Sequence, residues 1–306
     1  MAQSTGIEYG EEYTGYNNYY GRICQDILEM NYPVFLGKTY AYNQISIGDS
    51  YNLCRNLTKP GNIYGLNNTK TDSHMMKNSE WGAVVYLSYS QYGVNGQNIV
   101  CPNNVDLNSQ VNGKNEDGGT IYAITGYVGN SINATNIRFL SEPTLGDSIS
   151  DGTNTSYAWY TTNGLRGSAT QNITGVYDLS GCSWEYTAAY ISNANISING
   201  GALVSESDLK YKTIYPYSES SDTSIDNWNE YNKTGRYGDA ILETSTGGYS
   251  SDGWNEDRSM YPNSHAPFFT RGSMCKNPTK KGIFSFDDSI GQIFADSSFR
   301  VVLYAR

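Results

Sequence analysis

Residues 175–186 read GVYDLSGCSWEY, and this stretch decides the fold class of the chain. Gly175 and Gly181 bracket a turn, because glycine and the short polar residues between them adopt the conformations that tight turns require. The aromatic run that begins at Trp184 follows the turn, and aromatic residues are enriched in β-strands. We therefore expect a strand from about Trp184, with its indole packed in the core.

The composition of the whole chain also favours strands and turns. Its 306 residues include 28 tyrosines and 32 glycines. Only 16% are charged, against about 25% in an average soluble protein. Chains with few Lys and Glu residues are poor helix formers, whereas tyrosine is enriched in strands. Two interpretations of the tyrosines stay open: they form a recognition surface, as in binding loops, or they replace phenylalanine in the core.

Charge and hydropathy exclude several classes of protein. Twenty basic against thirty acidic residues give a formal net charge of -10, which argues against a nucleic-acid partner because phosphate binding needs a basic face. No stretch approaches about 18 consecutive apolar residues, so we expect no transmembrane helix and no membrane insertion. The first residues lack the basic start and the apolar run of an export signal. An aromatic content of 13% excludes a disordered chain.

Hydrophobic periodicity predicts two main helices. An N-terminal helical segment, residues 1–34, contains one apolar stripe at helical spacing. A second helix begins at Asn78 or Ser79, either of which can cap it, and Gly93 stops it. With no repeat and no Pro-rich linker, residues 35–306 are expected to form one domain. Strands are expected at 120–125, 282–286 and 301–304, and a polar, tryptophan-bearing loop region at 218–264.

Three segments in order are more specific than composition. Residues 75–87 read MMKNSEWGAVVYL, the turn and strand at 175–186 follow, and FTRGS at 269–273 precedes a closing SFRVVL at 298–303. Together they resemble the formylglycine-generating-enzyme-like branch of the C-type lectin fold. Within that branch the chain looks closest to surface and pilin-linked proteins of gut Firmicutes. It is also similar to retroelement-diversified variable proteins of these bacteria and their phages.

This resemblance implies an α+β fold, namely a β-rich, C-type-lectin-like domain over residues 35–306 with two main helices and long loops. It also implies a variable-type C-terminal loop region at about 271–300. Two tryptophans and two arginines of the matching segments are expected to be buried, with both guanidinium groups hydrogen-bonded, since an unpaired buried charge is untenable. These residues are Trp81, Trp184, Arg271 and Arg300.

The residues argue against catalysis. Oxidising members of the resembled family use two cysteines after the Arg-Gly-Gly-Ser strand, whereas here only Cys275 occurs there and no second cysteine follows. Iron-dependent relatives need several histidines, and this chain has only His74 and His265. Asp287 and Asp288 are adjacent strand residues, which point to opposite faces and make a poor hydrolytic pair. We therefore expect no enzyme activity. The alternative is a metal- or thiol-dependent enzyme with Cys275 as its reactive centre.

Calcium is the one cofactor that the resemblance implies. Family members bind the ion around the turn before Trp-Glu, and the corresponding side chains here belong to Asp178 and Glu185. Hard oxygen ligands of this kind suit Ca²⁺. Cys182 stands where the family carries asparagine. In the alternative interpretation, Asp178 caps the turn and Glu185 pairs with a buried arginine.

The resemblance also implies a ligand-facing surface in the C-terminal loop region, at polar positions interleaved with fixed ones. These positions are Lys276, Asn277, Thr279, Lys280, Ser285, Asp287, Asp288, Ser289, Gln292, Asp296 and Ser297. Ile293 and Phe294 are apolar residues in this polar run and are either core residues or hot spots of binding. The regions that carry Trp228 and Trp254 are the alternative location of the binding surface.

Together these observations predict non-catalytic ligand recognition, by a surface adhesin or by a phage receptor-binding protein of the diversity-generating-retroelement variable type. We expect the partner to be a protein or a glycan on another cell surface. The chain itself is expected to be extracellular, at a cell surface or on a virion tail. The remaining alternatives are the Cys275 enzyme and a structural pilin-like subunit.

Overall fold

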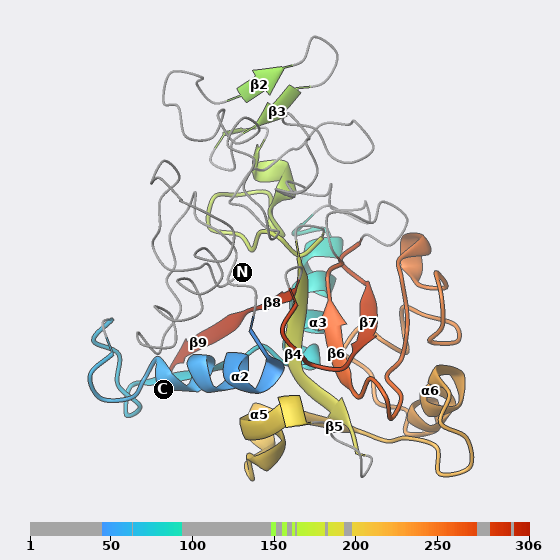
Figure 1. Cartoon of the computed structure of the whole chain (residues 1–306). Coiled ribbons are helices and arrows are strands. Elements are labelled where there is room, and N and C mark those ends of the chain that lie inside the picture. The colour runs from blue at the N-terminus through green and yellow to red at the C-terminus, as the bar shows by residue number, and fades with distance from the viewer. Residues whose placement is uncertain are drawn as a thin grey trace, which may run out of the picture.

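Figure 1 shows the computed structural model of the chain, in which helices and strands are mixed along the sequence. The structure describes residues 45–62, 64–93, 148–150, 155–157, 161–162, 164–180, 183–192, 198–273, 282–294 and 297–306. The expected helical segment 1–34 and the expected strand 120–125 lie outside the described residues. So do four cysteines, Cys24, Cys101, Cys182 and Cys275, and five expected ligand-facing positions, namely Lys276, Asn277, Thr279, Lys280 and Asp296.

The largest sheet is built around β4 (Trp184–Ile191). Antiparallel β6 (Phe268–Arg271) pairs with β4, and antiparallel β7 (Phe286–Ser289) pairs with β6. Two parallel strands, β5 (Thr213–Tyr215) and β8 (Ser297–Phe299), pair with opposite ends of β4. All 8 residues of β4 are buried, as expected for a strand that is covered on both faces. This confirms the strand predicted from Trp184.

Two smaller sheets accompany it. Antiparallel strands β1 (Thr71–Met75) and β9 (Val301–Ala305) form the first, with Thr71 opposite Ala305. This pair confirms the strand predicted at 301–304. The second consists of β2 (Ser148–Ser150) and β3 (Thr155–Tyr157), which are also antiparallel.

The strand predicted at 282–286 is wrong, because Phe286 alone among these residues belongs to a strand. The N–H of Ser285 donates to the carbonyl of Gly282 at 3.2 Å and closes a turn. Gly282 has a φ of 153°, a conformation that favours glycine. Ile283 and Phe284 are each 1% exposed, so their apolar character reflects packing of the turn against the core.

The predicted second helix is confirmed as α3 (Asn78–Tyr89), but its cap differs from the prediction. The residue before the helix is Lys77, whose N–H donates to Oε2 of Glu80 at 2.9 Å. This bond satisfies one of the backbone donors that a helix start leaves without a partner. Asn78 is buried instead, and its Oδ1 accepts from the hydroxyl of Thr187 at 2.9 Å.

Two further helices were not predicted, α2 (Ile47–Asn56) and α6 (Ser224–Lys233). Each follows a capping hydroxyl that accepts a hydrogen bond from the N–H three residues later, at Ser46 and Thr223. Because α6 lies inside 218–264, the expectation of a loop throughout that region is wrong. The shorter helical elements are α5 (Gly201–Ser205), η2 (Gly164–Gly167), η3 (Ile198–Gly200), η4 (Leu209–Tyr211) and η5 (Trp254–Glu256).

Tyrosines form much of the core beside α6. Trp228 and Tyr231, three residues apart on that helix, pack with Tyr215 in one cluster of buried residues. The hydroxyls of Tyr215 and Tyr231 both donate to Oδ2 of Asp239, the first at 2.8 Å. Burial, followed by the charge of Asp239, raises the pKa of both phenols. Tyrosine therefore replaces phenylalanine in this core, whereas other tyrosines are exposed, among them Tyr92, Tyr237 and Tyr249.

The four residues predicted to be buried are confirmed, with exposed fractions of 0% for Trp81, 7% for Trp184, 0% for Arg271 and 9% for Arg300. The guanidinium of Arg271 donates to the carbonyls of residues 239 and 240 at 3.3 and 3.1 Å. Burial lowers the pKa of Arg271 to about 10, so it stays charged at neutral pH. Arg300 donates to both carboxylate oxygens of Glu185.

The chain therefore has an α+β fold. In Figure 1, β4 runs through the centre of the described part, with α2 and β9 on one side and β6, β7 and α6 on the other. Every helix in the described ranges is too short or too polar to cross a lipid bilayer.

Candidate binding surface

The strand β7 divides the expected ligand-facing surface into two parts. Residues 282–285 precede this strand and residues 290–294 follow it, so the two segments lie beyond its opposite ends. The second segment lies against the start of α2, where the N–H of Ile47 donates to the carbonyl of Gly291 at 2.9 Å. The hydroxyl of Tyr186 donates to the carbonyl of Gln292 at 2.6 Å. The described parts of the expected surface therefore lie at opposite ends of β7.

Three expected ligand-facing serines lie in the interior, which corrects the prediction for them. Ser285 is 0% exposed, Ser289 8% and Ser297 4%. Ser285 closes the turn before β7. The hydroxyl of Ser289 accepts from the N–H of Gly291 at 3.1 Å, and Ser297 pairs with Trp184 between β8 and β4. These three serines therefore stabilise turns and strand pairs of the domain and are not available to a ligand.

Asp287 and Asp288 are half-buried and already have partners. A carboxylate oxygen of Asp287 accepts from Nε of Arg258 at 2.6 Å, and one of Asp288 accepts from the side chain of Asn263 at 2.9 Å. Burial, with the neighbouring Asp287 charge, raises the pKa of Asp288 to about 7. The prediction that both residues contact a ligand stays untested, and only part of each side chain is available for contact.

The segment after β7 presents an apolar side chain to solvent. Ile293 is 57% exposed, Gln292 is also exposed, and Phe294 is half-buried. The backbone bonds to Ile47 and Tyr186 hold this segment on the body of the domain. Ile293 therefore fulfils the condition set for a hot spot, which is exposure on a fixed frame.

A second patch, the aromatic face, consists of Tyr89, Trp254 and Phe284. The ring centroids of Trp254 lie 5.8 Å from Tyr89 and 5.3 Å from Phe284, and Tyr89 and Phe284 lie 5.3 Å apart. Trp254 is 42% exposed, whereas Phe284 is buried beneath it. Trp228, the other tryptophan considered, is excluded from the surface because its indole is 8% exposed and donates to Ser245 at 3.1 Å.

Asp257 joins the aromatic face to the C-terminal segment. Its carboxylate is 1% exposed, and one oxygen accepts from the N–H of Phe284 at 3.1 Å. Its own N–H donates to the carbonyl of Trp254 at 3.2 Å. Gly282 lies against the carboxylate so closely that an added Cβ would overlap it. Burial raises the pKa of Asp257 to about 8, so the carboxyl group is largely protonated at neutral pH.

The two residues expected to bind calcium, Asp178 and Glu185, are buried, and both contact Arg300. Nε and Nη2 of Arg300 donate to the two carboxylate oxygens of Glu185, at 2.9 and 2.6 Å. Nη2 of Arg300 also donates to the backbone carbonyl of Asp178 at 3.4 Å. In the described part of the chain, no group of three or more His, Cys, Asp or Glu side chains is arranged to hold a metal. Calcium at Asp178 and Glu185 stays a prediction of the resemblance.

The aromatic face was only partly foreseeable. Trp254 was singled out from its acidic loop, but Tyr89 and Phe284 reach it from distant parts of the chain, which no local pattern indicates. A comparison of the sequence with models of protein families and with curated proteins finds no match. The residues of the aromatic face and of the Ile293 segment are therefore the basis for the proposed function.

Proposed function

We propose that the chain is a non-catalytic recognition protein with a C-type-lectin-like fold, acting as a surface adhesin or a phage receptor-binding protein outside the cell. Its partner is a protein or glycan on another cell surface. The aromatic face forms the principal contact, and the exposed segment at Ile293 forms a second one. The observation that carries this proposal is an exposed tryptophan that is held rigidly beside the C-terminal loop region.

Trp254 has the properties of a binding anchor. Tryptophan and tyrosine supply a large contact area at low entropic cost, because few torsions must be fixed on binding. The face of an aromatic ring carries partial negative charge, which suits the polarised C–H groups of a sugar ring as well as apolar side chains. Tyr89 and Phe284 both pack against the indole, which favours one orientation of Trp254 before a ligand arrives.

The backbone around Trp254 is equally well fixed. The N–H of Trp254 donates to the carbonyl of Thr244 at 2.7 Å, and Asp257 connects the same turn to Phe284. A contact surface on such a frame loses little conformational entropy on binding, which is the general advantage of a preorganised site. Polar residues of the C-terminal loop region would then adjust specificity around this fixed anchor.

The test is a binding screen of labelled protein against whole cells and a glycan array. We expect Trp254→Ala to weaken binding by roughly 30-fold, the loss that truncation of a hot spot worth about 2 kcal/mol produces. Tyr237→Ala is the matched control, because Tyr237 is 72% exposed and is not part of the aromatic face. Its binding should equal that of the wild type.

Ile293→Ala distinguishes the two patches. A loss of binding with Ile293→Ala and not with Trp254→Ala would move the principal contact to the segment after β7. Binding that survives both substitutions in folded protein would overturn the proposal.

A further inference from the structure

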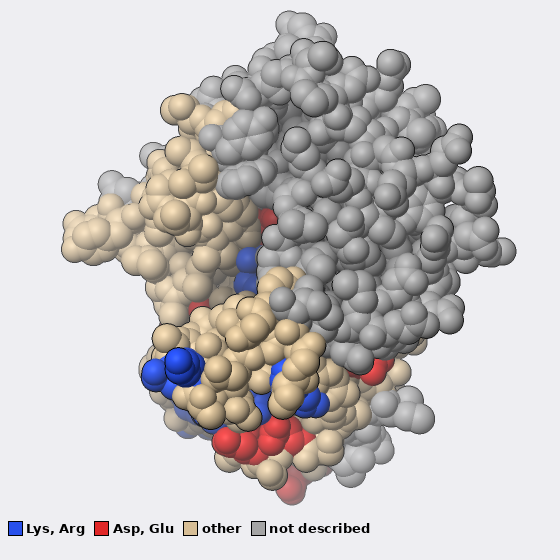
Figure 2. Space-filling model, turned by 90° about the vertical axis from the view of Figure 1, so that its left-hand side faces the viewer, with Lys and Arg blue, Asp and Glu red and all other residues tan. Residues whose placement is uncertain are grey.

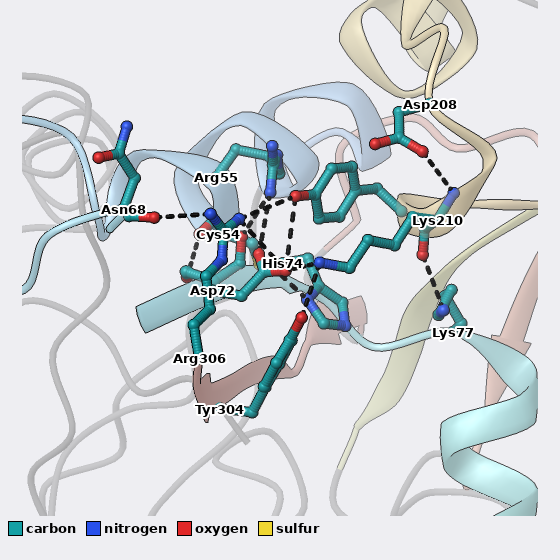
Figure 3. Close-up of polar contacts among 12 residues, drawn as sticks. Cys54, Arg55, Asn68, Asp72, His74, Lys77, Asp208, Lys210, Tyr304 and Arg306 are labelled. Atoms are coloured by element: carbon teal, nitrogen blue, oxygen red, sulfur yellow. Dashed lines mark hydrogen bonds and ion pairs between the residues drawn. The ribbon is translucent and has the colours of Figure 1, made fainter. Parts of the chain in front are cut away.

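Three cations surround a single buried carboxylate on the face of the molecule opposite to β6 and β7. Nη1 of Arg55 lies 3.4 Å from Oδ1 of Asp72, Nη2 of Arg306 lies 3.7 Å from Oδ2, and Nζ of Lys210 contacts the same oxygen. The side chain of Asp72 is 1% exposed, whereas those of the three cations are 26%, 41% and 42% exposed. Figure 3 shows them converging on Asp72 from different elements.

Asp72 neutralises only one of these charges. Its burial disfavours ionisation, but hydrogen bonds from Lys210 and Tyr304 lower the pKa of the carboxyl group below its usual value. The pKa of Lys210 is raised, chiefly by the hydrogen bond with Asp72. Among these four side chains, one carboxylate against three cations leaves an excess of two positive charges, and Glu206 and Asp208 lie at the edge of the cluster. The neighbouring His74 lies between two carboxylates, with Nδ1 3.9 Å from Asp72 and Nε2 2.7 Å from Glu80, and Lys77 contacts Glu80.

Lys70 lies beside Arg306 at the edge of this cluster. The N–H of Arg306 donates to the carbonyl of Lys70 at 2.8 Å, one residue beyond the Thr71–Ala305 pair of β1 and β9. Both residues therefore carry a positive charge just beyond the last paired positions of these two strands. The concentration of cations is unexpected in a chain whose formal net charge is -10. We name Arg55, Lys70, Lys210, Tyr304 and Arg306 the basic face.

The cations of the basic face are held in position. The guanidinium of Arg55 lies 3.5 Å from the ring centroid of Tyr211, and Nη1 of Arg306 donates to the carbonyl of Asn68 at 2.7 Å. Nζ of Lys210 donates to the hydroxyl of Tyr304 at 2.7 Å. The ring of Tyr304 is 42% exposed and therefore offers an apolar surface directly beside the charges.

The surroundings limit the size of the anion that this face can take. Figure 2 views the molecule from the side of α2 and the C-terminal residue, and Lys and Arg side chains gather in its lower half with acidic side chains along their edge. One of the acidic residues beside Lys210 is Asp208, whose carboxylate accepts from the N–H of Lys210 at 2.9 Å. A rigid duplex would bring its continuous row of phosphates against these acids, whereas a flexible polysaccharide can place a single anionic sugar between them.

We propose that the basic face binds an anionic sugar, with its sulfate or carboxylate group held by Lys210, Arg306 and Lys70 and its ring stacked on Tyr304. Arginine presents a planar fork of donors that matches both kinds of anion, and lysine adds a mobile point charge. The site shares no residue with the aromatic face or with the Ile293 segment. It is therefore a second binding site, and it does not depend on the proposed function of the first.

The experiment measures the affinity of the whole chain for heparin, a uronic-acid polysaccharide, neutral dextran and a short duplex DNA, at low and physiological salt. We expect heparin or the uronic-acid polymer to bind with an affinity that falls as salt rises, and dextran not to bind. Lys70→Gln with Arg306→Gln should weaken this binding at least 10-fold. Both side chains are exposed, and Lys70 does not contact Asp72, so the fold should persist.

Lys233→Gln is the matched control, because Lys233 is 69% exposed on α6 and pairs with Glu230. It removes one exposed positive charge from another face, as Lys70→Gln alone does from the basic face, and should leave binding unchanged. An unchanged affinity in the double variant would overturn the proposal, as would equal losses in the control. Duplex DNA that binds as tightly as either polysaccharide would also overturn it. Trp254→Ala should not alter heparin binding, which keeps this test separate from that of the aromatic face.

Discussion

Glu185 and Asp72 are both buried carboxylates in contact with arginine, yet their surroundings differ. Glu185 meets one guanidinium, that of Arg300, in two parallel hydrogen bonds, and both side chains lie in the interior. Asp72 meets three cations whose charged ends reach solvent. In the first pair one negative charge neutralises one positive charge away from solvent, so the pair contributes to stability and not to binding. The second keeps positive charge at the surface, where a ligand can meet it.

The largest expected effect comes from breaking the balanced pair. Glu185→Gln leaves the guanidinium of Arg300 buried without a counter-charge, and loss of one partner from a buried ion pair typically costs about 3–5 kcal/mol. We expect the free energy of unfolding to fall by that amount in urea denaturation. Arg258→Gln, which breaks the half-buried pair with Asp287, is the comparison and should cost about 1 kcal/mol or less. Equal losses of unfolding free energy in the two variants would show that the depth of burial does not determine the strength of these ion pairs.

Asp257 sharpens the comparison, because it is a buried carboxyl group without a cation in direct contact among the described residues. Its pKa is raised to about 8 by burial, above the usual value of about 4. The folded state then holds a proton that the unfolded state releases, so stability is greatest below pH 4 and declines as pH rises to 8. Asp257→Asn should remove about 2–4 kcal/mol of this decline between pH 5 and pH 8.

The measurement for Asp257 is the free energy of unfolding as a function of pH, for the wild type and the variant. Asparagine keeps an acceptor for the N–H of Phe284, so the aromatic face should stay in place. Parallel pH curves for the two proteins would show that Asp257 is ionised in the folded state.

A smaller effect is expected at Asp72. Asp72→Asn should lower stability by about 1 kcal/mol at neutral pH, because its cations are solvent-accessible and tolerate the loss of a counter-charge. Since the folded-state pKa of Asp72 is lowered, its contribution is present above the usual pKa of about 4 and is lost as pH falls below it. The same substitution should strengthen heparin binding by the basic face. A stability loss as large as that of Glu185→Gln would contradict the distinction between the two carboxylates.

The smallest effect is expected from chelation. Because Arg300 occupies both oxygens of Glu185, a calcium ion would have to displace this ion pair. We expect EDTA to change the melting temperature of the wild type by about 1 °C or less. A ligand that binds only the folded state stabilises it by mass action, so a clear fall in Tm would establish a bound cation. If that fall vanished in Glu185→Gln, the ion would be assigned to Glu185.

Local patterns in the sequence predicted the central frame. The Glu-Trp helix at α3 and the strand from Trp184 each depend on residues that are adjacent in the sequence, whereas the burial of Arg271 and Arg300 was expected from the family resemblance. The helix α6 was missed because its composition is polar, although the cap at Thr223 was present in the sequence. The strand predicted over Ile283 and Phe284 failed because an apolar pair can pack from a turn as well as from a strand.

The two binding surfaces could not be predicted in full, for a different reason. The aromatic face joins Tyr89, Trp254 and Phe284, and the basic face joins α2, β1, η4 and β9. These contacts arise only when the sheets bring distant segments together, and no local pattern marks the individual residues. Part of the expected C-terminal surface is buried, because Ser285 closes a turn, Ser289 lies in β7 and Ser297 lies in β8.

The buried phenols beside Asp239 give the protein an intrinsic optical signal. Their pKa is raised by burial, so they absorb as neutral phenols in alkaline solution while ordinary exposed tyrosines ionise near pH 10. Phenolate absorbance should therefore develop in two stages, the first reversible and the second coincident with loss of structure around Tyr215 and Tyr231. The second stage reports the opening of this one core directly, with no added label. It can be followed in every variant described above to establish which substitutions disturb folding.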